Sequence, residues 1–488
     1  MNTPSADIRR VDVAIVGAGT AGMSAYRAAL EHTKNVVVIE DGPFGTTCAR
    51  VGCMPSKLLI AAAEAAHAIE HAGGFGVHGA PLRVDGRAVV ERLRRERDRF
   101  VGFVVEAVER WPDGHRLRGR ARFADEQTLL VQRHDGGTTR VEAGRIVLAT
   151  GSRPVVPPGW REALGERLVV NDDVFDWTDL PRALAVVGAG VIALELAQAL
   201  SRLGVRVRLY GRSARLGPLT DPALQAVARQ VFAAELPLSL ECTSIAPRLE
   251  GDEVVVRSHG PDGWHEERFD LLLAAMGRLP NIDGLGLEHS GLPRDAAGVP
   301  RHDRRSGQVG ASRVFIAGDA ADDRPLLHEA ADEGRIAGDN AGRWPDLRVR
   351  PRRAPLAVVF SDPQIALAGA SHAELKRAGA DFETGDVSFD DQGRSRVMLK
   401  NRGALRVYGE RGSGRFLGAE MIGPAAEHIG HLLAWSAQRG DTVQQMLDSP
   451  FYHPVVEEGL RTALRGLQRA LGMGPPPVER CLDCGPGA

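Results

Sequence analysis

Two cysteines in one glycine-containing stretch are the residues of this chain best suited to redox chemistry. Cys48 and Cys53 are separated by four residues, with Gly45 and Gly52 nearby and Pro55 just after the pair. On a regular α-helix, Cα atoms at this spacing lie roughly 8–9 Å apart, whereas a disulfide needs about 4.4–6.8 Å. A bridge therefore requires an irregular backbone. The glycines permit one, and the proline suits the first turn of a following helix.

Two other interpretations of this pair are unrelated buried thiols and a metal site. No further ligands stand at metal spacing around the pair, so we predict no metal site. Cysteine pairs in a reducing compartment are more often catalytic than structural, and a strained, accessible bridge is easily reduced. We therefore favour a catalytic pair.

A histidine and a carboxylate near the end of the chain could supply the proton transfer that thiol chemistry needs. His453 precedes a proline, and Glu458 follows five residues after the histidine. The thiolate is the reacting species, so a base must accept the substrate proton, and a carboxylate can fix the imidazole tautomer. By position alone, an ordinary surface histidine is favoured, because the chain has 15 histidines.

The elements that would position a cofactor begin near the N-terminus. An apolar strand leads into a GxGxxG turn formed by Gly17, Gly19 and Gly22. A helix is predicted over 23–30, and a second strand over 35–39 ends at Glu40. The glycines let the backbone approach a pyrophosphate at the helix N-terminus, and the acid can accept ribose hydroxyls. The pattern predicts a dinucleotide site.

A second copy of this pattern predicts a second dinucleotide. Gly188 and Gly190 follow an apolar strand, a helix is predicted over 194–203, and a strand over 205–210. A duplicated βαβ unit without a ligand is the alternative. It is disfavoured because both turns keep the glycines that allow close approach.

The end of that second strand bears on the choice between NAD and NADP. Gly211 stands where NAD sites place an acid, with Arg212 next to it and Arg215 nearby. Arginine suits a 2′-phosphate, so we expect NADP(H) to be accepted. Ordinary surface arginine in an arginine-rich chain is the alternative.

Composition excludes several classes of partner. The chain has 488 residues, 43% hydrophobic and 25% charged, with a net charge of −2 and five cysteines. This balance gives no reason to expect nucleic acid or an anionic membrane as partner. No membrane span, secretory signal or disulfide framework is evident, so we expect a cytoplasmic protein.

Together these motifs resemble the flavin-dependent pyridine nucleotide–disulfide oxidoreductases, which include dihydrolipoamide dehydrogenase, glutathione reductase and mercuric reductase. Four further stretches are similar to that family, and they contain Thr150 and Gly151, Gly277, Asp319, and 358–364. The segment around His328 and the Pro-Ser-Lys ending of the cysteine motif are most similar to dihydrolipoamide dehydrogenases. Thr46 stands where a second glycine is usual in the family.

The resemblance implies an α/β fold with two Rossmann-like domains, for FAD and NAD(P), and a C-terminal α+β dimerisation domain. The implied boundaries are 1–155 and 281–350 for the two parts of the FAD domain, 156–280 for NAD(P), 355–471 for dimerisation, and 472–488 for a flexible tail.

It also implies roles for individual residues. Cys48 would be the thiol that meets substrate, and Cys53 the thiol against the flavin, with the two forming a redox-active disulfide. Lys57 would pair with Glu195 near the flavin, and the dyad of His453 and Glu458 would act across a homodimer interface. Cofactor contacts are expected from Gly17, Gly19, Gly22, Glu40, Thr150, Gly151, Asp319, His328, Gly188, Gly190, Arg212 and Gly277.

The leading functional hypothesis is a dihydrolipoyl dehydrogenase-like enzyme that passes electrons between a dithiol, the cysteine pair, FAD and NAD(P). The alternatives are an NADPH-dependent reductase of another disulfide or of Hg(II), and a flavin-bound redox sensor without turnover. The tail cysteines Cys481 and Cys484 could exchange with the active-site pair or be bystanders.

Overall fold

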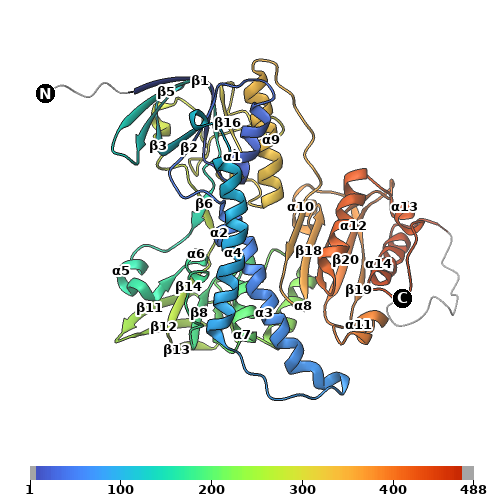
Figure 1. Cartoon of the computed structure of the whole chain (residues 1–488). Helices are drawn as coiled ribbons and strands as arrows, with labels where there is room; N and C mark the ends of the chain where they lie inside the picture. The colour runs from blue at the N-terminus through green and yellow to red at the C-terminus, as the bar shows by residue number, and fades with distance from the viewer. Residues whose placement is uncertain (1–6, 475–488) are drawn as a thin grey trace. The chain divides into compact units, whose positions relative to one another are not determined.

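The structure is a computed structural model that describes residues 7–474 (Figure 1). Cys481 and Cys484 lie outside these residues. The chain forms two compact units, each discontinuous in sequence. The first comprises Met1–Pro55, Arg92–Val155 and Gly277–Arg352; the second comprises Ser56–Glu91, Val156–Met276 and Arg353–Ala488.

A parallel sheet forms the centre of the first unit, in the order β3-β2-β1-β5-β16. β2 before Glu40, β16 and the last residues of β1 and β5 are apolar and buried, as expected for parallel strands covered on both faces. β3 and β5 continue beyond the parallel layer and pair with β4 in an antiparallel meander. The strands are β1 (Asp7–Val16), β2 (Val36–Glu40), β3 (Arg116–Asp125), β4 (Thr128–Arg133), β5 (Thr138–Leu148) and β16 (Val314–Ile316).

Two helices pack closely against each other beside this sheet (Figure 1). They are α1 (Thr20–Ala29) and α9 (Leu327–Arg343), from opposite ends of the unit's sequence. A Cβ on Gly334 would lie 2.1 Å from the Ala21 carbonyl oxygen, and one on Gly338 would lie 2.2 Å from that of Ala25. Only glycine allows this backbone approach.

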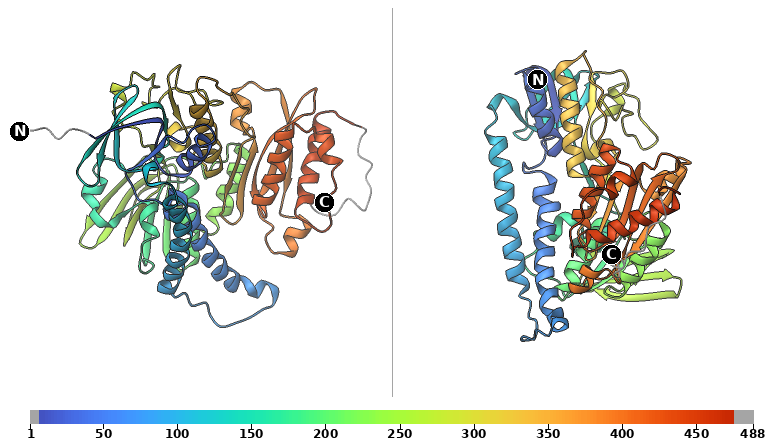
Figure 2. Two further views of the ribbon diagram at one scale, coloured as in Figure 1. Left: turned by 45° about the horizontal axis from the view of Figure 1, so that its top comes forward. Right: turned by 90° about the vertical axis from the view of Figure 1, so that its right-hand side faces the viewer.

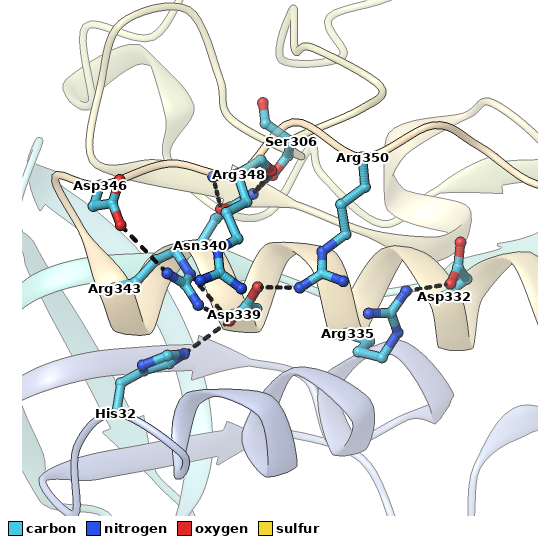
Figure 3. Close-up of polar contacts among 10 residues, drawn as sticks. All are labelled: His32, Ser306, Asp332, Arg335, Asp339, Asn340, Arg343, Asp346, Arg348 and Arg350. Atoms are coloured by element: carbon cyan, nitrogen blue, oxygen red, sulfur yellow. Dashed lines mark hydrogen bonds and ion pairs between the residues drawn. The ribbon is translucent and has the colours of Figure 1, made fainter.

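Asp339 of α9 anchors the loops around these helices (Figure 3). Its carboxylate accepts hydrogen bonds from His32 Nε2 at 2.8 Å, from Arg343 at 3.1 Å and from Arg350 at 2.9 Å. Burial alone would raise the pKa of Asp339, but these hydrogen bonds outweigh it and lower the pKa to about 2. The network therefore stabilises the ionised form of a buried group.

Asp339→Asn should destabilise the protein at neutral pH. The folded-state pKa lies below the unfolded value, so the stabilisation is complete above about pH 5 and lost as pH falls through about 2, with a size of about 2 kcal/mol. Urea unfolding at several pH values measures it. The control is Asp346→Asn, because Asp346 is exposed and pairs with Arg343 at 3.4 Å. Equal losses in both variants at pH 7 would contradict the assignment.

The second unit contains another parallel sheet, in the order β10-β9-β8-β14-β7, and an antiparallel meander of β11, β12 and β13. The parallel strands are β7 (Leu168–Val169), β8 (Ala183–Val187), β9 (Arg206–Tyr210), β10 (Leu238–Ser239) and β14 (Leu271–Ala274). The meander strands are β11 (Ser244–Glu250), β12 (Glu253–Gly260) and β13 (Gly263–Phe269). Two helices of this part of the unit are α7 (Val191–Arg202) and α8 (Pro222–Ala233).

The C-terminal part of this unit is an antiparallel sheet, ordered β17-β18-β21-β20-β19, that packs on helices (Figures 1 and 2). The strands are β17 (Leu356–Val359), β18 (Gln364–Gly369), β19 (Phe382–Ser388), β20 (Ala404–Glu410) and β21 (Phe416–Gly423); the helices are α12 (Ala426–Arg439) and α14 (Glu457–Ala470). The predicted fold class, two Rossmann-like layers and an α+β C-terminal region, is confirmed.

Candidate active site

The two cysteines lie on either side of a break between helices. Cys48 belongs to α2 (Thr47–Val51), and Cys53 begins α3 (Cys53–His71). Gly52 between them has φ −131° and ψ −118°, so the backbone is irregular where the spacing predicts it. Both are free thiols in this structure. A hydrogen bond with Cys53 and, second, burial raise the pKa of Cys48. Oxidation of the two thiols to a disulfide stays a prediction.

The turn before α2 holds two consecutive residues with positive φ. Gly45 has φ +119°, and Thr46 has φ +58°. Thr46 Oγ1 accepts a hydrogen bond from the Ala49 N–H at 3.2 Å, which caps α2. A residue with a strained backbone destabilises the fold by on the order of 1–3 kcal/mol, and a side-chain N-cap stabilises a helix by about 1 kcal/mol, so the cap offsets part of the strain. The cap explains how threonine fits a position where glycine is usual in similar sequences.

Lys57, one turn after Cys53 in α3, forms the predicted pair with Glu195 of α7. The Lys57 Nζ lies 2.7 Å from the Glu195 carboxylate, which is buried. The other Glu195 oxygen accepts the Phe360 N–H at 2.9 Å, and the ammonium lies 4.5 Å from the Phe360 ring centroid. The lysine is therefore held by an ion pair and a cation–π contact at once.

Glu195→Ala should destabilise the protein by about 1–3 kcal/mol, because it leaves the partly buried Phe360 N–H and the partly buried Lys57 ammonium without their acceptor. Chemical denaturation measures the loss. Glu64→Ala is the control, since Glu64 is an exposed glutamate of α3. A similar loss in the free energy of unfolding for both variants would show that the contacts of Glu195 do not stabilise the protein.

His453 and Glu458 form a hydrogen-bonded dyad at the start of α14. His453 Nδ1 lies 2.9 Å from one Glu458 oxygen and 3.1 Å from the other. The carboxylate also accepts from the Val455 N–H at 3.2 Å and from Arg461 at 3.4 Å. The glutamate side chain is 6% exposed and the histidine 79%. Because a carboxylate only accepts, Nδ1 carries the proton, and Nε2 is left as a base that substrate can reach.

The first glycine turn has the shape of a pyrophosphate cradle. A Cβ on Gly17 would lie 2.2 Å from the Ala149 carbonyl oxygen, and one on Gly22 would lie 1.9 Å from that of Gly17. Gly19, the N-cap of α1, has open space around it. Glu40 ends β2 and accepts the Ala18 N–H at 2.6 Å. The first and third glycines thus allow tight packing, and the second leaves room for a phosphate.

Thr150 and Asp319 form a second group of polar residues. They follow β5 and β16, which belong to the same sheet as β1, the strand that leads into the glycine turn. Thr150 follows β5, and its Oγ1 is buried without a partner among residues 7–474. Asp319 follows β16 and accepts a 2.6 Å hydrogen bond from Ser152, which in turn accepts one from Arg278 at 2.8 Å. The orphaned hydroxyl and the half-buried carboxylate fit the polar groups of FAD.

Other residues predicted at the cofactor differ in how strongly the structure supports them. Gly151 and Gly277 both have positive φ, +69° and +109°, which only glycine adopts freely. They flank the short pair of β6 (Ser152–Pro154) and β15 (Arg278–Pro280). His328 lies on the first turn of α9 and is exposed. Its cofactor role stays a prediction.

The second glycine turn repeats the geometry of the first. A Cβ on Gly188 would lie 2.1 Å from the Ala275 carbonyl oxygen, whereas Gly190 has open space around it. Arg212 and Arg215, just after β9, are exposed and have no ion-pair partner within residues 7–474. Both guanidinium groups are available to a phosphate.

Residues 11–334 match the pyridine nucleotide-disulphide oxidoreductase family, and residues 356–464 match its dimerisation domain. The chain belongs to this family. FAD and NAD(P) are its cofactors, and the dimerisation domain supports a homodimer.

Relatives of this oxidoreductase carry different names. The mercuric reductase of Acidithiobacillus ferrooxidans is 32% identical, over 95% of this chain and 84% of that protein. The dihydrolipoyl dehydrogenase of Bacillus subtilis is 28% identical, over 93% of this chain and 97% of that protein. LpdA from Mycobacterium tuberculosis superposes with a TM-score of 0.79 at 25% identity, covering 94% of this chain and 99% of that one.

One contact of the candidate site was not predicted. The sequence around Phe360 resembles the start of the dimerisation domain, but its contacts with Lys57 and Glu195 depend on tertiary packing that no motif encodes. Within the described residues, no helix is long and apolar enough to cross a membrane.

Proposed function

We propose that this oxidoreductase catalyses dithiol–disulfide exchange of the dihydrolipoyl dehydrogenase type, linked to NAD(P). The observation that carries the proposal is the dyad of exposed His453 and buried Glu458. Forming a disulfide from a dithiol releases protons, so a positioned base lowers the barrier by making the thiolate. Reduction of a bound metal ion has no comparable need for a base beside the leaving sulfur.

The proposed exchange balances over two steps. A substrate thiolate attacks the sulfur of Cys48 in the oxidised pair, the Cys48–Cys53 bond breaks, and Cys53 leaves as a thiolate. The second substrate thiol, deprotonated by His453, then attacks the mixed disulfide and releases Cys48. The substrate is oxidised by two electrons, and the cysteine pair is reduced by two. Bound FAD supplies the two-electron link between this pair and NAD(P).

Turnover of the purified holoenzyme tests the proposal. NAD(P)H oxidation is measured with lipoamide, oxidised glutathione and Hg(II), and the reverse reaction with dihydrolipoamide. We expect lipoamide to give the highest kcat/KM. Turnover with Hg(II) alone, or with oxidised glutathione alone, would contradict the proposal and identify that compound as the substrate. No turnover with any of the three would favour a redox sensor.

Hg(II) reduction is the second candidate, because 32% identity to mercuric reductases accompanies a cysteine pair near the C-terminus. Truncation after Val478 removes Cys481 and Cys484. Selective loss of Hg(II) turnover would support this candidate. Unchanged activity with all three substrates would make the tail a bystander.

Coenzyme preference can be predicted from the end of β9. Arg212 and Arg215 are exposed there, and neither has an ion-pair partner in the described part of the chain. We expect Arg212→Glu to lower kcat/KM for NADPH by roughly 10–100-fold, since a charge-assisted bond is replaced by repulsion worth about 1.5–3 kcal/mol. Activity with NADH should change little, and Arg161→Glu, at an exposed arginine of α5 (Trp160–Leu164), is the control. An unchanged kcat/KM for NADPH in Arg212→Glu would contradict the prediction.

A further inference from the structure

The last turns of α3 bring two histidines and a glutamate together. His67, Glu70 and His71 occupy positions i, i+3 and i+4, which are neighbours on a helix surface. One ligand atom of each residue lies within 4.8 Å of the other two. The two imidazole rings have centroids 3.9 Å apart. Small side-chain rotations would let a single ion contact all three.

His71 already has the hydrogen bond that orients a metal ligand. Its Nδ1 lies 3.0 Å from the carbonyl oxygen of His67. A carbonyl can only accept, so Nδ1 carries the proton and Nε2 keeps a free lone pair. Histidines that bind metal ions usually donate their other ring N–H in this way, which fixes the tautomer and the ring orientation.

The charges around this group favour a cation. Residues 58–82 contain no lysine or arginine, and their only carboxylates are Glu64 and Glu70. Glu70 has no ion-pair partner within residues 7–474, so its carboxylate is available. Arg202 faces His67 but is itself paired with both Glu235 and Asp362. The carboxylates named here, Glu64, Glu70, Glu235 and Asp362, outnumber the single guanidinium of Arg202.

One other cluster in the described chain has ligand atoms at similar distances, formed by Glu31, His32 and Asp339. It lacks the free ligands that a metal ion needs. Asp339 is already bonded to His32, Arg343 and Arg350 (Figure 3). Two guanidinium groups neutralise its charge and would repel a cation. The α3 cluster has neither obstacle.

We propose that His67, Glu70 and His71 form a binding site for a divalent transition-metal ion such as Zn(II). Two imidazoles and a carboxylate are ligands that suit Zn(II), Ni(II) and Cu(II), and three ligands leave a position for water or an outside ligand. His67 lies 14 residues beyond Cys53 in the sequence of α3, and the proposed ligands do not include either redox thiol. The sequence alone predicts no metal site.

Calorimetric titration of the holoenzyme with ZnCl2 tests this site. Iodoacetamide treatment beforehand blocks accessible cysteines, so that thiolates do not compete for zinc. We expect one zinc ion per subunit. The His67→Ala/His71→Ala and His71→Gln variants should bind at least about 10–100-fold more weakly, the loss seen even for outer-shell partners of metal sites. Circular dichroism without zinc should show unchanged folding, because alanine and glutamine suit an exposed helix.

The matched control is His428→Ala/His431→Ala, which removes two exposed histidines from α12. This variant should bind zinc as the unmodified sequence does. Zinc should also raise the melting temperature of the control but not of the His67→Ala/His71→Ala variant. Absence of zinc binding by the unmodified sequence would overturn the proposal. Equal affinity of the α3 variants, or loss of binding in the control, would do the same.

Discussion

Replacing Cys48 or Cys53 by serine should lower kcat for disulfide turnover by on the order of 10⁴–10⁶, because each member of a unit that acts together is indispensable. Cys48 and Cys53 lie on either side of the break at Gly52, and a hydrogen bond between their side chains raises the pKa of Cys48. The matched control is Cys242→Ser. Cys242 is buried and its Sγ contacts the Ser239 carbonyl oxygen at 3.3 Å, so turnover should persist.

The two cysteine variants should also differ from each other in absorbance. If Cys53 faces the flavin, two-electron reduction gives a long-wavelength thiolate–flavin band that survives in Cys48→Ser and disappears in Cys53→Ser. The opposite pattern would reverse the two roles. Loss of turnover without any difference in absorbance would leave the pair catalytic but contradict the division of labour.

His453→Ala should lower kcat by about 10²–10⁴, the usual worth of a general acid–base. Glu458→Gln should lower it less, because the neutral amide still lies beside Nδ1 but no longer favours the charged imidazole. The bell-shaped pH dependence of kcat/KM should lose one limb in His453→Ala. His265→Ala, at an exposed histidine of β13, is the control. Equal losses in the control and the dyad variants would remove His453 from the mechanism.

Mixed dimers test whether this histidine serves the cysteines of the other subunit. One subunit carries His453→Ala and the other carries Cys48→Ser, so each is inactive as its own homodimer. A site shared between subunits would regain activity at one of the two positions. Mixed dimers that stay inactive would place His453 and Cys48 of one subunit in the same site.

Local patterns were enough to predict the βαβ elements but not their limits. The helix predicted over 23–30 begins at Thr20, because Gly19 is its N-cap and the helix starts inside the glycine turn itself. The helix of the second βαβ unit also begins earlier than predicted. It was expected over 194–203, but α7 begins at Val191, directly after Gly190. Periodicity locates an element, whereas its first residue depends on backbone angles that only the folded turn fixes.

Candidate site residues that are close in sequence, or that share a motif with relatives, could also be predicted. His453 and Glu458 are five residues apart and do form a dyad. The contacts of Phe360 with Lys57 and Glu195 could not be predicted, because they join three distant segments. The cluster of His67, Glu70 and His71 was also not predicted, because exposed polar residues at this helical spacing are common and only the folded side chains bring their ligand atoms within 4.8 Å.

The packing of α1 against α9 has a consequence for synthesis of the chain. The alanine face of α1 is translated at the start of the sequence, but the glycines that cover it, Gly334 and Gly338, come more than three hundred residues later. At about 5–20 residues per second, a ribosome needs roughly 15–65 s to reach them. Throughout that interval the nascent chain exposes the apolar face of α1, and β5, once made, lacks its neighbour β16. The first unit therefore cannot complete its core until its last segment, 277–352, has been made.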